Sequence, residues 1–151
     1  MPRRSHPLIY IRSARQGDAG DIAALLGVLG YPCTVNEALA RLRAIAAESD
    51  QSLLIAERAG QVCGLLALDA MYYLPLGART CRITALVVAP AHQGEGIGHE
   101  LLQAAEAWAR QAGAIRIEVT SAAHRERAHA FYRACGYDDR SIRFVKHLGD
   151  A

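Results

Sequence analysis

The spacing of apolar residues predicts strands and helices along the whole chain. A first strand is expected from Leu8 to Arg12, where apolar and polar side chains alternate. A helix is expected next, up to Leu29, because its apolar residues recur at intervals of three and four. We expect Asp18 to cap the start of this helix and Gly30 to end it.

The next segment predicts a second helix and then a β-hairpin. The helix should open at Thr34–Glu37, a capping box in which hydroxyl and carboxylate each bind a backbone N–H of the other residue. Two β-rich runs, Ser52–Glu57 and Gln61–Asp69, should pair across a turn that ends in Gly60. Aromatic, Pro and Gly residues within Met71–Ala78 predict a loop.

A buried strand and a long amphipathic helix are expected in the middle of the chain. The run Ile83–Ala89 is almost wholly apolar, and Pro90 should end it. Helical periodicity then extends from Gly96 to Ala112. We expect its inward stripe to include Trp108 as a core residue. The full stripe is Ile97, Leu101, Ala105, Trp108 and Ala112.

Three further elements follow. They are a strand at Ala114–Thr120, a helix at Arg125–Ala134 that Gly136 closes, and a last strand at Ile142–His147. Alternating strands and helices, with no internal repeat or linker, indicate one α/β domain over residues 1–151.

Composition and charge narrow the functional classes. A net charge of +2 over 151 residues, with no long basic run, does not indicate a nucleic-acid-binding surface. No stretch approaches the about 18 apolar residues of a membrane span, so no membrane partner and a cytoplasmic location are expected. The four cysteines lie far apart and show no metal-ligand spacing, so no metal site is expected.

The segment Gln93–Gly98 carries the most informative pattern. Three alternate glycines follow a buried strand and open a helix, whose first N–H groups and dipole attract anions. Because glycines let the backbone approach phosphate oxygens closely, the segment predicts a pyrophosphate site. A Walker loop is excluded because His99, and not lysine, follows Gly98. A dinucleotide-binding fingerprint would need its third glycine at position 99 or 101, and these positions are His99 and Leu101, so the fingerprint is incomplete.

These residues resemble a known family. The pattern Gln93-x-x-Gly96-x-Gly98, preceded by Leu86-x-Val88-x-Pro90, is similar to the acyl-CoA-binding motif of the GCN5-related N-acetyltransferase (GNAT) superfamily. The pattern Ala130-Phe131-Tyr132-x-x-x-Gly136-Tyr137 supports the resemblance. It implies an α+β fold with a mixed, mostly antiparallel sheet of about six to seven strands, flanked by about four helices.

The resemblance implies acetyl-CoA as co-substrate. The backbone of Leu86–Val88 would pair with the pantetheine arm, and the Val88 N–H would face the thioester carbonyl, where negative charge develops. Arg125 and Arg127 would reach the 3′-phosphate, unless they form a solvated helix face. The implied coenzyme residues are Leu86, Val87, Val88, Gln93, Gly94, Glu95, Gly96, Ile97, Gly98, His99, Arg125 and Arg127.

The resemblance also implies a general acid, at Tyr132. A phenol with an ordinary pKa of about 10 is protonated at neutral pH, so it can give a proton to the leaving thiolate. No base is evident, and Glu118 and Asp69 are the nearest candidates by topology. Loop aromatics near Tyr31 and Tyr72 are candidates to line an acceptor groove.

Three functions remain open at this point. The first is transfer of an acetyl group to a primary amine of a small molecule or a protein, by direct attack in a ternary complex. The second is a non-catalytic acyl-CoA-binding sensor or partner module. The third is a small dinucleotide-binding protein. Exposed strand edges also make a homodimer a reasonable expectation.

Overall fold

The computed structural model describes residues 8–120, 125–139 and 141–149. The chain divides into two compact units, residues 1–120 and residues 121–151. Within the described residues, the first unit holds a β-sheet and three α-helices. The second holds one α-helix and a segment outside any helix or strand.

The first unit is built on one five-stranded sheet in which the spatial order of the strands follows their order in the chain. Strands β1 to β4 pair antiparallel, and β5 pairs parallel to β4. The mixed, mostly antiparallel sheet is confirmed, but the described residues contain five strands and not six to seven. The strands are β1 (Ile9–Ser13), β2 (Gln51–Arg58), β3 (Gln61–Tyr73), β4 (Ala78–Val88) and β5 (Ala114–Val119).

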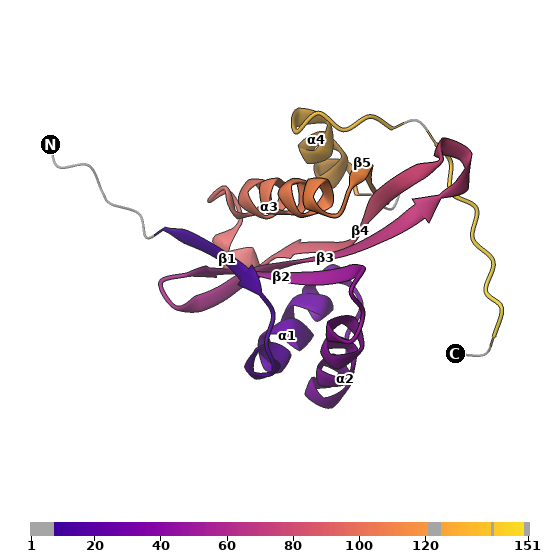
Figure 1. Cartoon of the computed structure of the whole chain (residues 1–151). Coiled ribbons are helices and arrows are strands. Elements are labelled where there is room, and N and C mark those ends of the chain that lie inside the picture. Colours follow the sequence, from indigo (N-terminus) through magenta and orange to yellow (C-terminus); the bar gives the residue numbers. More distant parts are fainter. Residues whose placement is uncertain (1–7, 121–124, 140, 150–151) are drawn as a thin grey trace, which may run out of the picture. The chain divides into compact units, whose positions relative to one another are not determined.

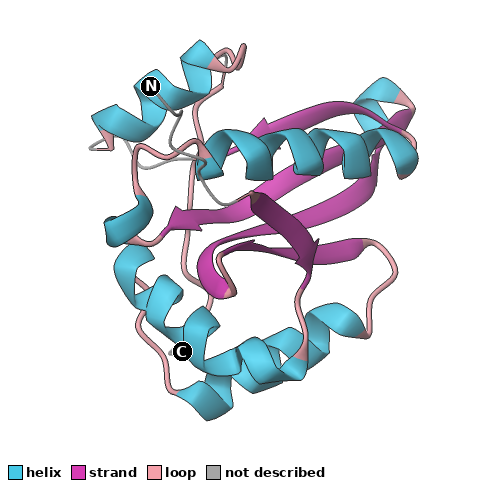
Figure 2. Cartoon of the chain, turned by 90° about the vertical axis from the view of Figure 1, so that its left-hand side faces the viewer, coloured by secondary structure: helices cyan, strands magenta, loops and turns pink. Residues whose placement is uncertain are grey.

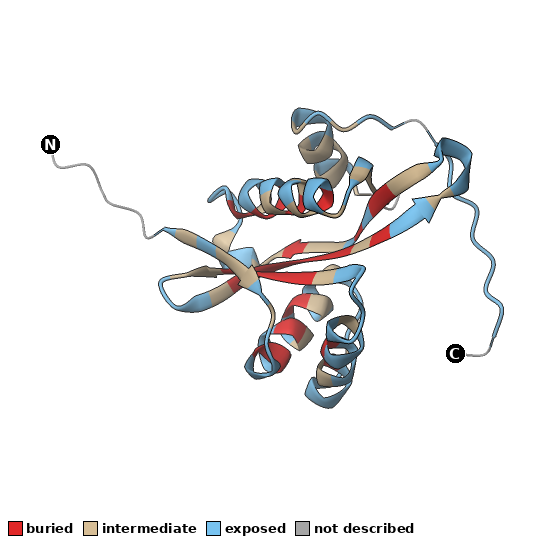
Figure 3. Ribbon diagram, in the orientation of Figure 1, coloured by how far each residue is buried: buried red, intermediate tan, exposed pale blue. Residues whose placement is uncertain are grey.

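Helices cover both faces of this sheet. Helices α1 (Ala19–Leu29) and α2 (Val35–Ala46) lie on one face, and α3 (Ile97–Gln111) lies on the other (Figure 1). The side view shows α3 running along the sheet (Figure 2). Buried residues gather where the helices meet the strands (Figure 3). The core beneath α1 and α2 consists of Ile22, Leu25, Ala38, Leu42, Leu53, Ile55, Leu65, Ala67 and Val87.

Several predicted element ends are confirmed at atomic detail. In the capping box, Glu37 N donates to Thr34 Oγ1 at 3.1 Å and Thr34 N donates to Glu37 Oε1 at 3.0 Å. Gly30 ends α1 in the left-handed region, with φ 105°. The β2–β3 turn has positive φ at Ala59 (52°) and Gly60 (78°), as a two-residue hairpin turn of type I′ requires.

The predicted loop over Met71–Ala78 is wrong. Strand β3 continues to Tyr73 and β4 begins at the last residue of that range. Only a short 3₁₀ turn, Leu74–Leu76, and Gly77 in the left-handed region separate them. The Pro and Gly residues mark this turn alone, and the two aromatic residues before it pair across the hairpin, as strand-forming residues do.

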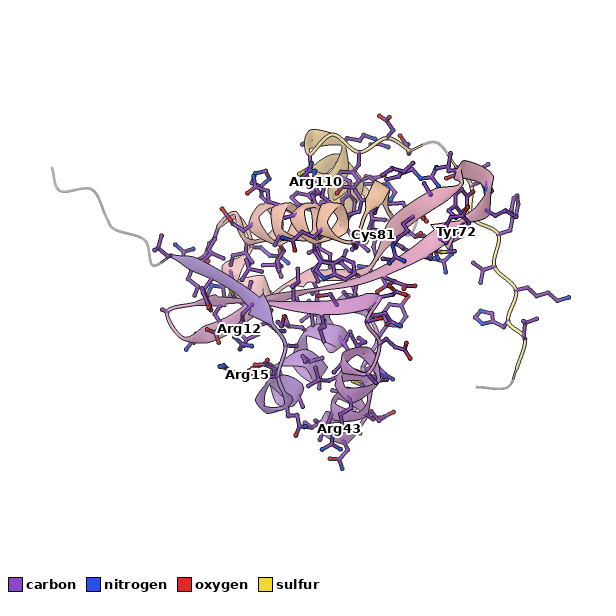
Figure 4. The ribbon with its side chains drawn as sticks, in the orientation of Figure 1. Arg12, Arg15, Arg43, Tyr72, Cys81 and Arg110 are labelled. Carbon is purple, nitrogen blue, oxygen red and sulfur yellow. The ribbon has the colours of Figure 1, made fainter. Side chains whose placement is uncertain are left out.

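Asp18 precedes α1 but its side chain does not cap that helix. The carboxylate is buried, accepts hydrogen bonds from Arg12 Nη1 and Nη2 at 2.8 Å each, and accepts a third from Arg15 N at 2.8 Å. Arg12 Nη2 also donates to Glu57 Oε1 at 2.7 Å. The Arg12 guanidinium holds the pKa of Asp18 below its ordinary value. Arg12, labelled in Figure 4, therefore links β1 both to β2 and to the start of α1.

The buried face of α3 is rotated from the predicted one. Trp108 is half-buried, so its assignment to the core is wrong, and Ala112 is half-buried as well. Ala109 takes an inward position instead and is buried. The buried residues of α3 are Ile97, Leu101, Leu102, Ala105 and Ala109.

The second unit contains α4 (Glu126–Ala134), which confirms the predicted helix. The predicted strand at Ile142–His147 is wrong, because residues 141–148 form no strand. Ile142 is 81% exposed and Phe144 is 90% exposed. Apolar alternation makes a segment suitable for a strand, but a strand forms only where a neighbour pairs with its N–H and C=O groups.

The described part of the chain places limits on membrane and metal sites. No helix in it is long and apolar enough to cross a membrane. The same residues contain no group of three or more His, Cys, Asp and Glu side chains that could hold a metal ion. Cys63 and Cys81 are free and buried, and burial raises the pKa of both thiols.

Candidate active site

The C-terminal half of β4 has an open edge. Pairing with β5 runs as far as Ile83 opposite Val119, where β5 ends. On its other side β4 stays paired with β3 as far as Val88 opposite Gly64. Within the described residues, positions 84–88 of β4 therefore have a strand neighbour on one side alone.

A β-bulge lies where the edge opens. Ala85 pairs with Ala67 and Ile83 pairs with Leu68, so Thr84 is the extra residue in β4. A bulge bends a strand and increases its twist, so β4 changes direction next to the point where its pairing with β5 ends.

The hydrogen-bond pattern identifies the amides on the open edge. Ala89 N donates to Cys63 O at 2.8 Å, so this N–H points toward β3. N–H directions alternate along an antiparallel strand. The N–H groups of Val88 and Leu86 therefore point away from β3, toward the open edge of β4. An extended ligand can pair there in the manner of an added strand.

The glycine loop, defined here as residues 93–98, connects β4 to α3. Gly94 has φ 82° and Gly96 has φ 84°, and Gly96 is the N-cap of α3. A Cβ on either residue would meet no atom within 4 Å, so the backbone conformation, and not crowding, requires glycine. The N–H groups of the first helical turn have no acceptor within the helix and lie at its electropositive end.

Two side chains from outside the glycine loop, Arg58 and His92, contact the carboxylate of Glu95 within it. Arg58 Nη1, at the end of β2, lies 2.9 Å from Glu95 Oε2, and His92 Nδ1 lies 2.9 Å from the same oxygen. The hydrogen bond with His92 and the nearby guanidinium of Arg58 hold the pKa of Glu95 below its ordinary value. The carboxylate of Glu95 is thus occupied by protein partners.

In the first turn of α3, His99 Nε2 lies 3.1 Å from Gln103 Nε2.

Close packing sets the position of α3 on the sheet. A Cβ on Gly64 of β3 would lie 3.1 Å from Leu101 Cδ1, 3.1 Å from Val87 O and 3.2 Å from Ile97 Cγ2. Ile97 and Leu101 are both fully buried. Gly64 therefore lets the first turns of α3 approach the sheet closely, which positions the helix N-terminus relative to the end of β4.

The two predicted proton acceptors lie on either side of an arginine. Asp69 on β3 is opposite Arg82 on β4, and Arg82 is opposite Glu118 on β5. Arg82 Nε and Nη2 each donate to Glu118 Oε1 at 3.2 Å. The sheet therefore brings Glu118 to Arg82 as an ion pair, and it separates the two carboxylates.

The remaining predicted residues lie in the second unit. Arg125 is half-buried and Arg127 is exposed. Tyr132 is half-buried, with its ring centroid 5.5 Å from that of Phe131 and 6.0 Å from that of Tyr137. Burial raises the pKa of Tyr132, so the phenol stays protonated at neutral pH.

The aromatic residues predicted for an acceptor groove are exposed. Tyr31 is 66% exposed and Tyr72, at the β3–β4 hairpin, is 61% exposed (Figure 4). Tyr73 is half-buried and has the guanidinium of Arg116 5.0 Å above its ring.

Sequence reasoning missed Arg58 and Gly64. Arg58 lies 37 positions before Glu95, so no local pattern links the two residues. Gly64 lies inside a strand, where an isolated glycine is a recognisable sign of close backbone approach. That sign identifies a tight contact but not the helix that makes it.

Two cavities lie elsewhere on the first unit, and neither includes the glycine loop. The larger, of about 540 Å³, lies beside the Arg12–Asp18–Glu57 cluster, and the smaller, of about 150 Å³, lies between α2 and the start of β2. The larger is lined by Arg12, Arg15, Gly17, Asp18, Asp21, Glu57, Gly60, Gln61 and Val62.

Comparison with known proteins identifies relatives of the whole arrangement. A family model described as "Acetyltransferase (GNAT) family" matches residues 28–137. The matched range includes the open edge of β4, the glycine loop and α4.

Individual relatives agree with this match. An aminoalkylphosphonate N-acetyltransferase of Salmonella typhimurium is 39% identical over 94 residues, which are 62% of this chain and 61% of that protein. An aminoglycoside N(6')-acetyltransferase type 1 of Stenotrophomonas maltophilia is 30% identical over 133 residues, 85% of this chain and 86% of that protein. The crystal structure of a transcriptional regulator from Bacillus halodurans C-125 has a TM-score of 0.86 at 22% identity, covering 93% of this chain and 100% of that one, and so shares the fold.

Proposed function

The chain belongs to the GNAT acetyltransferase family, and from this premise we propose that it transfers an acetyl group from acetyl-CoA to a primary amine. One observation carries the proposal. The outward-facing amides of Leu86 and Val88 lead directly into the glycine loop and the N-terminus of α3. An unpaired strand edge followed by an anion-binding helix end suits a ligand with an amide-containing arm and a pyrophosphate.

In this proposal the coenzyme lies along the end of β4. The pantetheine arm pairs with the backbone of Leu86–Val88, and the pyrophosphate receives N–H groups from the glycine loop and His99. The Val88 N–H points to the thioester carbonyl oxygen. A fixed donor at this position stabilises the tetrahedral intermediate by about 3–4 kcal/mol. The side chain of Glu95 already binds Arg58 and His92, so Glu95 contributes its backbone alone.

The reaction is a direct attack in a ternary complex. The neutral amine nitrogen attacks the thioester carbon, the C–S bond breaks, and the thiolate of CoA leaves. Tyr132 gives its phenolic proton to that thiolate, and the proton lost by the amine restores the phenol through solvent. The role of Tyr132 is supported by the family pattern around it and by its raised pKa. Arg125 and Arg127 bind the 3′-phosphate.

The acceptor we propose is a small-molecule amine. Two relatives are named for such acceptors, an aminoalkylphosphonate and aminoglycosides. Amines of proteins are a second class for the same chemistry. A screen of both classes for amine-dependent thiol release identifies the acceptor.

The wider organisation is also part of the proposal. Residues 1–151 form one acetyltransferase domain, since the family match spans residues of both units. The edge strands β1 and β5 offer pairing sites for a homodimer, which size-exclusion chromatography with light scattering tests. The location we propose is the cytoplasm, where acetyl-CoA is available.

The proposed reaction is tested by two measurements on the purified protein. Titration calorimetry with acetyl-CoA measures binding, and a thiol reagent measures release of CoA in the presence of amines. Binding without thiol release for any amine indicates a sensor and not an enzyme. Replacing Tyr132 with phenylalanine should lower kcat by about 100-fold with little change in the Kd for acetyl-CoA. Unchanged kcat removes Tyr132 from the mechanism.

A further inference from the structure

The glycine loop carries a negative charge at the position where the proposed function places an anionic ligand. Glu95 lies between Gly94 and Gly96, the two residues with left-handed backbone. A carboxylate there repels a pyrophosphate, and the repulsion grows as water is displaced. The pattern Gln93-x-x-Gly96-x-Gly98 does not require an acidic residue at position 95.

Arg58 balances that charge from a distant part of the sequence. It is the last residue of β2, its side chain is 12% exposed, and its Nη1 lies 2.9 Å from Glu95 Oε2. Glu57 of β2 contacts Arg12, on the face of the sheet that α1 covers. Because successive side chains of a strand point to opposite faces, Arg58 projects from the face that α3 covers. The short β2–β3 turn beside Arg58 limits the movement of its backbone.

We propose that Arg58 is a positioning residue that neutralises and holds Glu95, so that the glycine loop can receive the pyrophosphate of the coenzyme. The inference rests on the proposed function. The low exposure of the Arg58 side chain and its contact with Glu95 favour this role over direct contact with phosphate. The β2–β3 hairpin thereby becomes part of the coenzyme site without touching the coenzyme.

A double-mutant cycle tests the proposal, with the Kd for CoA measured by titration calorimetry. Arg58→Gln should raise the Kd about fivefold or more, because it leaves the Glu95 charge uncompensated. Glu95→Gln keeps the backbone amide and removes the charge that repels the pyrophosphate, so it should lower the Kd. The double variant should have a Kd within about twofold of that of Glu95→Gln, because the charge that Arg58 balances is then gone.

Three controls separate this role from a structural one. Arg43→Gln removes one positive charge from α2, on the other face of the sheet, and should leave the Kd unchanged (Figure 4). Arg58→Lys keeps the charge and should keep most of the affinity. The Arg58→Gln effect should also appear in KM for acetyl-CoA and not in kcat, whereas a general loss of structure would lower both together with the melting temperature.

Distinct results overturn the inference and the proposed function. If the wild-type chain binds CoA and Arg58→Gln binds it equally well, the inference is wrong and the proposed function stands. If Arg58→Gln weakens CoA binding by the same factor in the wild-type chain and in the Glu95→Gln variant, Arg58 contacts phosphate directly. The positioning role is then wrong. If the wild-type chain itself does not bind CoA, the proposed function is wrong.

Discussion

Replacing Gly64 with alanine should destabilise the protein, although an added methyl group stabilises many glycine positions. At this site the Cβ would lie 3.1 Å from Val87 O, 3.1 Å from Leu101 Cδ1 and 3.2 Å from Ile97 Cγ2. The carbonyl belongs to the paired part of β4 and cannot retreat without breaking the ladder. Overpacking of this kind costs about 1–3 kcal/mol, against a gain of about 0.4–1 kcal/mol from the stiffer unfolded chain. The expected net loss is therefore about 1–2 kcal/mol.

The matched control is Gly27→Ala in α1. A Cβ on Gly27 meets nothing within 4 Å, and the residue is helical, so this variant should gain about 0.5–1 kcal/mol. Urea unfolding followed by circular dichroism gives the free energy of unfolding for both variants. Because Ile97 begins α3, Gly64→Ala should also weaken acetyl-CoA binding, while Gly27→Ala should not. A Gly64→Ala protein as stable as Gly27→Ala would refute the packing argument.

Two further predictions concern the network and the cap that position the first two helices. Asp18→Asn should cost about 3 kcal/mol at neutral pH, because it removes one partner of a buried ion pair with Arg12. The Asp18 pKa is lowered by folding, so its contribution is complete above the unfolded value of 3.8 and is lost as pH falls through the folded value. Urea unfolding across this range should show the difference from wild type shrinking in acid, and a constant difference would contradict the ion-pair account. Thr34→Ala should lower the free energy of unfolding by about 1 kcal/mol in the same measurement, because it removes the capping hydrogen bond. Thr34→Ser keeps the hydroxyl and should lower it little. Equal losses for both variants would exclude the capping hydrogen bond as the cause.

The sequence alone determined the features that depend on neighbouring residues. The capping box at Thr34, the turn at Gly60 and the start of α3 at Gly96 follow from local backbone chemistry, which short patterns record. The glycine loop was recognisable for the same reason, because the groups proposed to bind phosphate are the amides of a few consecutive residues.

Errors arose where tertiary contacts compete with local preference. The sequence around Tyr72 contains turn residues, yet pairing between β3 and β4 extends the strands past it. Asp18 has the residue type of a helix cap, but the guanidinium of Arg12 holds its carboxylate more strongly than a helix N–H would. In both cases a contact with another element of the fold outweighs the local interaction that the sequence suggests.

The tertiary structure alone decided how the candidate site is completed. The pairing of β5 with β4 as far as Ile83, the contact of Gly64 with α3, and the ion pair between Arg58 and Glu95 all join residues far apart in the chain. No periodicity or motif encodes such contacts, because they depend on how the strands align in register and on how closely a helix approaches the sheet. The chain's local chemistry therefore marks the glycine loop, and its packing decides which residues elsewhere in the chain contact that loop.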